Sequence, residues 1–127
     1  MERLKVFSHL IYEYKKGIRD TALCTLTMEC REQAINKLKT NKIAYFICPI
    51  NDERFNIFFG SKVCIDVIGS ICDKPLNQLS PKEDFMLGTI LGYGICEQCK
   101  RYSKKNKLKD MSVDNKTYIR DYTLAVV

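Results

Sequence analysis

The stretch IAYFICPINDERFNIFFG, residues 43–60, decides the fold of this 127-residue chain. Ile43 to Ile50 is a nearly continuous apolar run, which Pro49 and the polar Asn51-Asp52-Glu53 bring to an end. Phe55 to Phe59 then forms a second apolar and aromatic run. Short runs of this kind on either side of a polar turn predict two consecutive β-strands.

The segments before and after these two strands show the apolar spacing of helices. Residues 29–40 carry Cys30, Ala34 and Leu38 on one stripe at helical spacing. After the strands, Ser61 is a suitable N-cap for a second helix, which Asp73-Lys74-Pro75 ends. The apolar face of this second helix consists of Val63, Cys64, Val67, Ile68 and Ile71.

The N-terminal residues alternate in a way that predicts further strands. From Leu4 to Tyr14, one side of the pattern is Leu4, Val6, Leu10 and Tyr12, and the other is Phe7, His9 and Ile11. Gly17 supplies turn chemistry, and Thr21 to Met28 is expected to pair back as a hairpin.

The resulting order predicts an α+β, two-layer protein: an antiparallel four-stranded sheet with two helices on one face (ββαββα), plus one or two C-terminal helices. From Thr21 onward the order is ferredoxin-like, with the N-terminal strand in place of the last strand, as in a circular permutant. We expect residues 1–102 to form a single α+β domain and residues 103–127 a basic C-terminal extension.

Both faces of this sheet are apolar in places, because Phe46 opposes Tyr45 and Ile47, and Phe58 opposes Ile57 and Phe59. A sheet with one solvated face would carry polar residues at alternate positions. The second face must therefore be covered. We expect the helices of residues 79–102 to cover it; a homodimer through this face and another protein are the alternatives.

Residues 79–102 contain strong helix signals. Ser80, Pro81 and Glu83 form a capping-box pattern at a helix start. Gly88 and Gly92 lie on one face of that helix, where they would let another backbone approach as a packing groove. Gly92-Tyr93-Gly94 predicts a break, after which a new helix begins at about Gly94.

Cys96 and Cys99 are the Cys-x-x-Cys pair of the chain, in the first turns of this new helix. A helix N-terminus with Lys100 and Arg101 close by would lower a thiol pKa, which favours a redox pair. Against this, a thioredoxin-like site follows a strand, and zinc needs four ligands, whereas no second pair exists and His9 is the single histidine. Seven cysteines without an export signal indicate reduced thiols in a cytoplasmic protein.

The net charge of +6 is concentrated at the C-terminal end, where residues 100–127 hold eight Lys and Arg against three acids. Such a basic arm favours an acidic protein, a nucleic acid or an anionic membrane. The arm lacks interleaved aromatic residues, which argues against nucleic acid, and no apolar run is long enough to span a membrane. No motif predicts a catalytic, cofactor or metal site, so we expect a protein that is not an enzyme.

Residues 6–102 resemble a small bacterial family known as a domain of unknown function. The blocks that carry the resemblance are Ile11–Gly17, Leu23–Leu26, Lys74–Pro81, Glu83–Phe85, Leu87-Gly88, Leu91–Tyr93 and Gln98–Tyr102. The resemblance implies a cytoplasmic α/β protein, often encoded near flavodoxin genes, and it carries no catalytic residues.

We therefore expect a non-enzymatic protein-interaction or accessory protein, with an acidic flavodoxin as a candidate partner. Its predicted partner surface is Gly88, Gly92, Tyr93, Lys100, Arg101 and Tyr102. The alternative is a thiol redox or metal-binding protein that uses Cys96 and Cys99.

Overall fold

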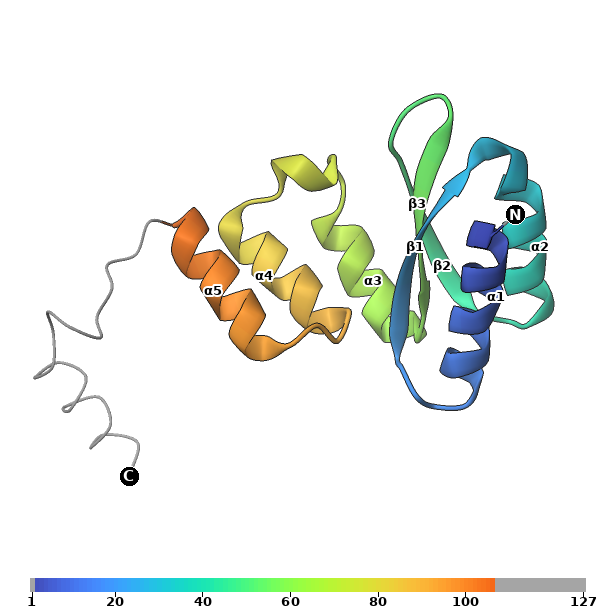
Figure 1. Cartoon of the computed structure of the whole chain (residues 1–127), viewed down its shortest axis with the longest axis horizontal. Helices are drawn as coiled ribbons and strands as arrows, with labels where there is room; N and C mark the ends of the chain where they lie inside the picture. The colour runs from blue at the N-terminus through green and yellow to red at the C-terminus, as the bar shows by residue number, and fades with distance from the viewer. Residues whose placement is uncertain (1, 107–127) are drawn as a thin grey trace, which may run out of the picture.

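A computed structural model describes residues 2–106, which form a three-stranded antiparallel sheet between layers of helices (Figure 1). Along the chain the elements are α1 (Glu2–Lys15), β1 (Thr21–Thr27), η1 (Met28–Cys30), α2 (Arg31–Thr40), β2 (Ala44–Pro49), β3 (Arg54–Gly60), α3 (Lys62–Ile71), η2 (Leu76–Gln78), α4 (Pro81–Ile90) and α5 (Ile95–Lys105).

Strand β3 lies at the centre of the sheet, in the order β1-β3-β2. Both neighbours pair with it antiparallel, and Gly60 lies opposite Thr21 on one side and Ala44 on the other. The β2–β3 hairpin predicted from residues 43–60 is present. Its turn is held by Asn51, whose Oδ1 accepts hydrogen bonds from the backbone N–H groups of Glu53 and Arg54 at 2.8 and 2.9 Å.

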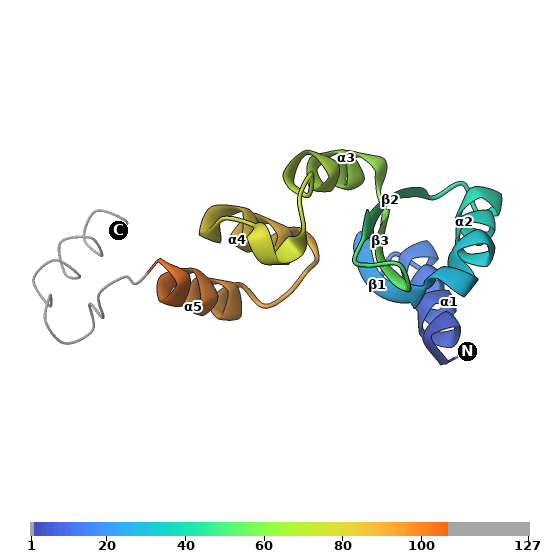
Figure 2. The same ribbon diagram turned by 90° about the horizontal axis from the view of Figure 1, so that it is seen from above.

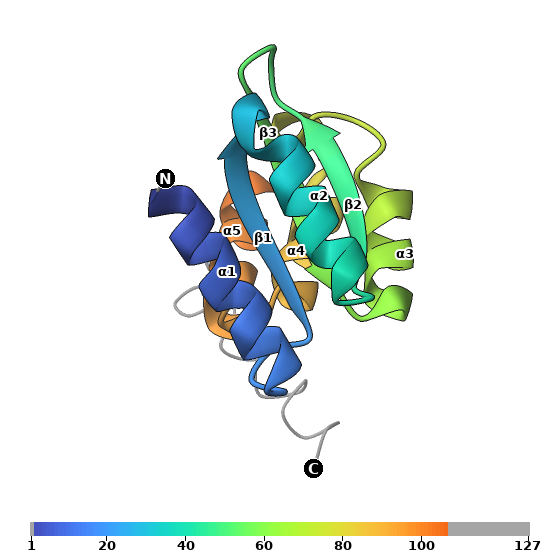
Figure 3. The same cartoon turned by 90° about the vertical axis from the view of Figure 1, so that its right-hand side faces the viewer.

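Alternation along β3 sends apolar side chains to both faces of the sheet. Phe55, Ile57 and Phe59 point into a core with α1 and α2, whereas Phe58 points into a second core with α3 and α4. All four side chains are at most 1% exposed. Helices consequently cover both faces, with α1 and α2 on one side and α3 and α4 on the other, where α5 packs on α4 (Figure 3).

The predicted N-terminal strand is wrong, because Glu2–Lys15 is the helix α1. Its buried side chains, Phe7 and Ile11, are four positions apart, so they lie on one face of the helix. The strand prediction placed Val6 and Tyr12 on one side of the strand together with Leu4 and Leu10, but in the helix each of the two is 54% exposed. Apolar residues on the solvent side of the helix produced an apparent period of two.

The predicted two-layer, four-stranded sheet with two helices on one face is therefore wrong as well. Within residues 2–106 the structure has three strands and five α-helices. Helix α3 packs on the face opposite to α2, and α1 takes a place beside α2 (Figure 3). No strand completes a permuted ferredoxin-like order in this part of the chain, since the residues expected to supply it are helical.

The second face of the sheet is covered by the chain's own helices, as expected, although α3 contributes as well as α4. Ile65 and Ile68 of α3 and Leu87 of α4 share a buried cluster with Phe58. Thr21 of β1 donates its hydroxyl to the carbonyl oxygen of Ile90 at 2.7 Å, which ties the end of α4 to the sheet. Dimerisation through this face stays a prediction, and it would have to displace α3 and α4.

The predicted start of α4 is confirmed. Ser80 Oγ accepts from the backbone N–H of Glu83 at 3.1 Å, and Glu83 Oε1 accepts from the backbone N–H of Ser80 at 2.8 Å. Lys74 also donates to Glu83, at 2.9 Å. This reciprocal cap pairs two donors that the first turn of a helix would otherwise leave free.

Helix α5 continues beyond residue 102 and ends at Lys105. The predicted boundary at 102 thus falls inside a helix, and residues 107–127 of the predicted basic extension lie outside the described residues. In residues 2–106, no helix combines the length and apolar character that crossing a membrane requires.

Gly60 ends β3 with a φ of 144°, and a Cβ there would collide with the backbone of Asp20. Gly17 also has a positive φ, of 79°, but has open space around it. We expect Gly60→Ala to lower the free energy of unfolding by about 3 kcal/mol, through strain and collision together. Gly17→Ala should cost about 1 kcal/mol, from strain alone. Urea unfolding measures both, and equal losses would contradict the collision at Gly60.

Candidate functional site

Helices α4 and α5 lie side by side and are joined by the short connection of residues 91–94 (Figure 2). Gly92 has a φ of 81°, and Tyr93 N–H donates back to the carbonyl oxygen of Gly88 at 3.0 Å. The predicted break is therefore confirmed. A Cβ atom added at Gly92 would meet no other atom within 4 Å, so Gly92 is not part of the packing groove that was predicted. Its positive φ instead allows the chain to leave the helix at this point.

Gly88 is the glycine that allows close packing. It is buried, and a Cβ there would overlap the side-chain amide of Gln98. Gln98 is 5% exposed and is the buried residue of α5. Gln98 was not among the site residues predicted from the sequence. The signal that could have indicated it is that Gln98 and Tyr102, four residues apart, share one face of α5.

Asp84 holds α5 against α4 through two basic side chains. Arg101 donates from Nη2 to Oδ1 at 2.9 Å and from Nε to Oδ2 at 3.3 Å, and Lys105 Nζ lies 3.2 Å from Oδ1. The hydrogen bond from Arg101 is the main cause that lowers the pKa of Asp84. Arg101 was predicted as part of the partner surface; in the structure it is a bidentate partner of Asp84.

The other predicted surface residues on or next to α5 differ in how far they are exposed. Tyr102 packs against Phe85 of α4, with ring centroids 5.9 Å apart. The Lys100 side chain is 75% exposed and lies 3.5 Å from Glu97. Tyr93, in the turn before α5, is 53% exposed.

A groove opens where β1, α4 and α5 meet; we call it the α4–α5 groove. Its lining residues are Leu23, Asp84, Leu87, Gly88, Leu91, Tyr93, Gln98 and Arg101. Three predicted surface residues therefore meet in it, namely Gly88, Tyr93 and Arg101, while Gly92, Lys100 and Tyr102 do not line it. The lining is mostly apolar and includes the Asp84–Arg101 ion pair, so the groove can accept an apolar side chain or a small ligand.

The two cysteines of the Cys-x-x-Cys pair are free and exposed on α5. In contrast, Cys24, Cys30, Cys48 and Cys72 are buried. Burial, with smaller contributions from Cys48, Glu83 and Asp73, raises the pKa of Cys72 to about 11. Among residues 2–106, no three His, Cys, Asp or Glu side chains are grouped so that they could hold a metal ion.

The fold and the groove define a small α+β protein with an exposed, basic helical face and no grouped metal ligands in residues 2–106. The chain belongs to the family described as "Protein of unknown function (DUF2023)", whose model matches residues 5–105. The resemblance to a family of unknown function is thereby confirmed, and the match ends where α5 ends. A comparison with curated proteins finds no match.

Asp84→Asn tests the ionic contact between α4 and α5. Because the pKa of Asp84 is lowered in the folded protein, its contribution is present above the ordinary Asp pKa and is lost as the pH falls through the lowered value. We expect a loss of about 1 kcal/mol in the free energy of unfolding at neutral pH. The loss should shrink as the pH falls below the ordinary Asp pKa of about 3.9.

The matched control for Asp84→Asn is Asp66→Asn, which breaks an exposed pair with Lys62 on α3. It should change stability by less than about 0.5 kcal/mol. Urea unfolding at several pH values measures both variants. Equal effects at neutral pH, or a loss in Asp84→Asn that does not depend on pH, would contradict the assigned contact.

Timed alkylation tests the two classes of thiol. Cys96 and Cys99 should react first in the native protein because they are exposed, whereas Cys72 should react after unfolding because it is buried with a raised pKa. Mass spectrometry of digested samples locates the label. Modification of Cys72 at the rate of Cys96 in the folded protein would be inconsistent with the structure.

Proposed function

We propose that the chain is a non-enzymatic, cytoplasmic protein-interaction or accessory module that binds its partner on the α4–α5 groove and the outer side of α5. One observation carries the proposal: α5 uses one narrow side to pack on α4, so most of its surface stays exposed. Gln98 is its buried residue, and Tyr102 is partly buried on Phe85.

The charge of α5 favours an acidic partner. The helix carries Lys100, Arg101, Lys104 and Lys105 against the single acid Glu97. Asp84 engages Arg101 and Lys105, which leaves Lys100 and Lys104 on the exposed surface. Lys100 lies 3.5 Å from Glu97, and the helix still carries a net positive charge. A surface charge of one sign speeds the encounter with a protein of opposite charge.

Apolar anchors lie next to this charge. Tyr93 and Ile95 are 53% and 55% exposed at the start of α5, and Tyr93 borders the α4–α5 groove. An exposed aromatic residue beside a groove and among basic residues is typical of binding hot spots. We propose a flavodoxin-type redox protein as the partner, on the basis of the gene proximity that the family resemblance implies and the charge of α5.

An alternative proposal is a thiol redox or metal-binding role for Cys96 and Cys99. The supporting observation is that both thiols are free and exposed, three positions apart on α5. Incubation with a glutathione redox buffer tests it. A disulfide between Cys96 and Cys99 at cytosolic ratios would favour this role, whereas thiols that stay reduced would argue against it.

Titration of a labelled acidic flavodoxin with the full chain tests the interaction. We expect saturable binding at low salt that weakens as salt screens the charges. Replacing Lys100 and Lys104 together by Glu should weaken binding at least about tenfold, and Tyr93→Ala should do so at any salt. No binding at low salt would refute the proposed partner.

The matched control for the charge reversal is the joint replacement of Lys5 and Lys39 by Glu, at exposed positions of α1 and α2 on the far side of the sheet. It changes net charge without touching α4 or α5, so binding should stay within about twofold. A loss equal to that of the α5 variant would mean that net charge, and not this surface, governs the encounter.

A further inference from the structure

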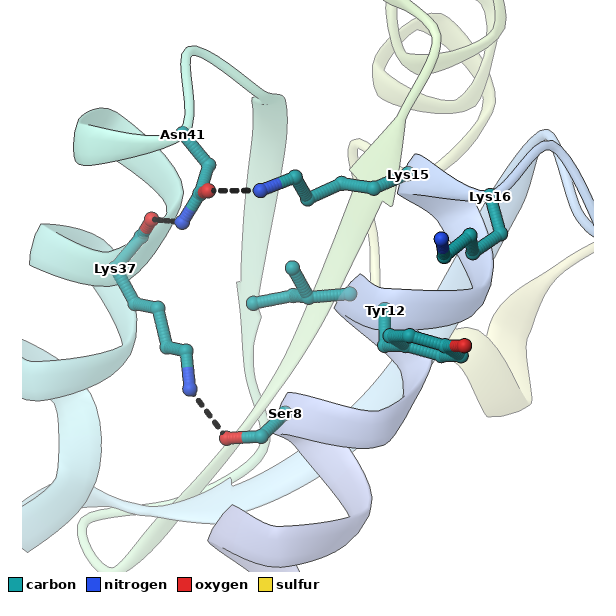
Figure 4. A pocket seen from close by; sticks show the side chains of 7 residues that line it. Ser8, Tyr12, Lys15, Lys16, Lys37 and Asn41 are labelled. Carbon is teal, nitrogen blue, oxygen red and sulfur yellow. Dashed lines mark hydrogen bonds between the residues drawn. The ribbon is translucent and has the colours of Figure 1, made fainter.

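A second groove lies at the other end of the molecule, between α1 and α2 (Figure 4). We call it the α1–α2 groove. Its lining residues are Ser8, Ile11, Tyr12, Lys15, Lys16, Lys37 and Asn41. Three of these seven side chains are cationic and none is acidic. None of the seven belongs to the proposed partner surface on α4 and α5.

Two lysines cross this groove in opposite directions. Lys15 of α1 donates from Nζ to Oδ1 of Asn41 at 2.9 Å, and Lys37 of α2 donates from Nζ to Oγ of Ser8 at 2.6 Å (Figure 4). The amide of Asn41 is itself oriented, because its Nδ2 donates to the carbonyl oxygen of Lys37 at 2.8 Å. Both ammonium groups are thereby held over the groove.

The hydrogen-bond partners of Lys15 and Lys37 are neutral side chains. The two ammonium groups are therefore held in place, but no carboxylate neutralises their charge in these bonds. Elsewhere in residues 2–106, Lys62, Lys74 and Lys105 pair with the carboxylates of Asp66, Glu83 and Asp84. An ammonium has three N–H donors, and each of these two uses one in the bonds described. Donors therefore remain on Lys15 and Lys37 for an anion that lies between them.

Ile11 and the ring of Tyr12 supply the apolar part of the groove. Ile11 is 3% exposed, and the ring of Tyr12 has Lys16 Nζ at 5.6 Å from its centroid. An apolar or flat group can pack on such a wall while a charged group reaches the lysines. The groove thus combines a place for an anion with a place for a hydrophobic body.

We propose that the α1–α2 groove binds a phosphorylated small molecule, with its phosphoryl group between Lys15 and Lys37 and its apolar part against Ile11 and Tyr12. A phosphate monoester carries roughly two negative charges and three acceptor oxygens at neutral pH, so one group can pair with both ammoniums. A single carboxylate of an acidic peptide carries one charge and matches this pair less well. The site is separate from the proposed partner surface.

A ¹H–¹⁵N NMR titration of the full chain with inorganic phosphate, AMP and adenosine tests this site. We expect saturable shifts at Ser8, Lys15, Lys37 and Asn41 with phosphate and AMP. AMP should bind more tightly than phosphate because its base can pack on Tyr12, and adenosine should cause no saturable shift. The absence of saturable shifts at these residues with both phosphate and AMP up to about 10 mM would overturn the proposal.

Replacing Lys15 and Lys37 together by Met should weaken AMP binding at least about tenfold, because both ammoniums are lost while the aliphatic stems remain. The control is the joint replacement by Met of Lys5 and Lys39, two exposed lysines of α1 and α2 that do not line the groove. It should leave the affinity within about twofold. Equal weakening in the two variants would overturn the assignment of the lysines.

A measurement on the unsubstituted chain keeps the test independent of the folding of the variants. AMP affinity should fall when KCl is raised from about 50 to about 300 mM, since two exposed ammoniums supply the attraction. An affinity that does not change with salt would contradict the phosphate site. A tetraglutamate peptide that shifts the same residues at lower concentration than AMP would also overturn it, in favour of an acidic protein segment.

Discussion

The two-sided apolar character of β3 is the constraint on which the rest of the structure depends. Phe55, Ile57 and Phe59 must be buried on one face and Phe58 on the other, and as the central strand β3 cannot turn either set toward water. Burial of such side chains is the main favourable term in folding. Helices must therefore pack on both faces, and this requirement places α1 and α2 opposite α3 and α4.

Local chemistry made part of this fold predictable. The β2–β3 hairpin and the reciprocal cap at Ser80 depend on residues close in sequence, and both were predicted correctly. The N-terminal helix was not predictable in the same way. Residues 4–14 carry apolar side chains on all sides of the helix. Phe7 and Ile11 are the ones that are buried, and this can be recognised once the sheet face on which the helix packs is known.

The candidate site shows the same division between local and tertiary information. The break near Gly92 follows from two glycines in three residues and was predicted. The different roles of Gly88 and Gly92, by contrast, depend on where α5 returns, because Gln98 fills the space over Gly88 and nothing approaches Gly92. Likewise, Arg101 was predicted as part of a partner surface. Its contact with Asp84, which precedes it by 17 positions, depends on the fold that brings the two residues within hydrogen-bond distance.

The full pairing of β3 has a consequence for how the two ends of the molecule communicate. Both edges of β3 are hydrogen-bonded along the strand, and its side chains are locked into cores on either side. Allosteric coupling requires an element with two discrete arrangements. A sheet held in one register offers no such element, so ligands at the α1–α2 groove and at the α4–α5 groove should bind with additive free energies and without cooperativity.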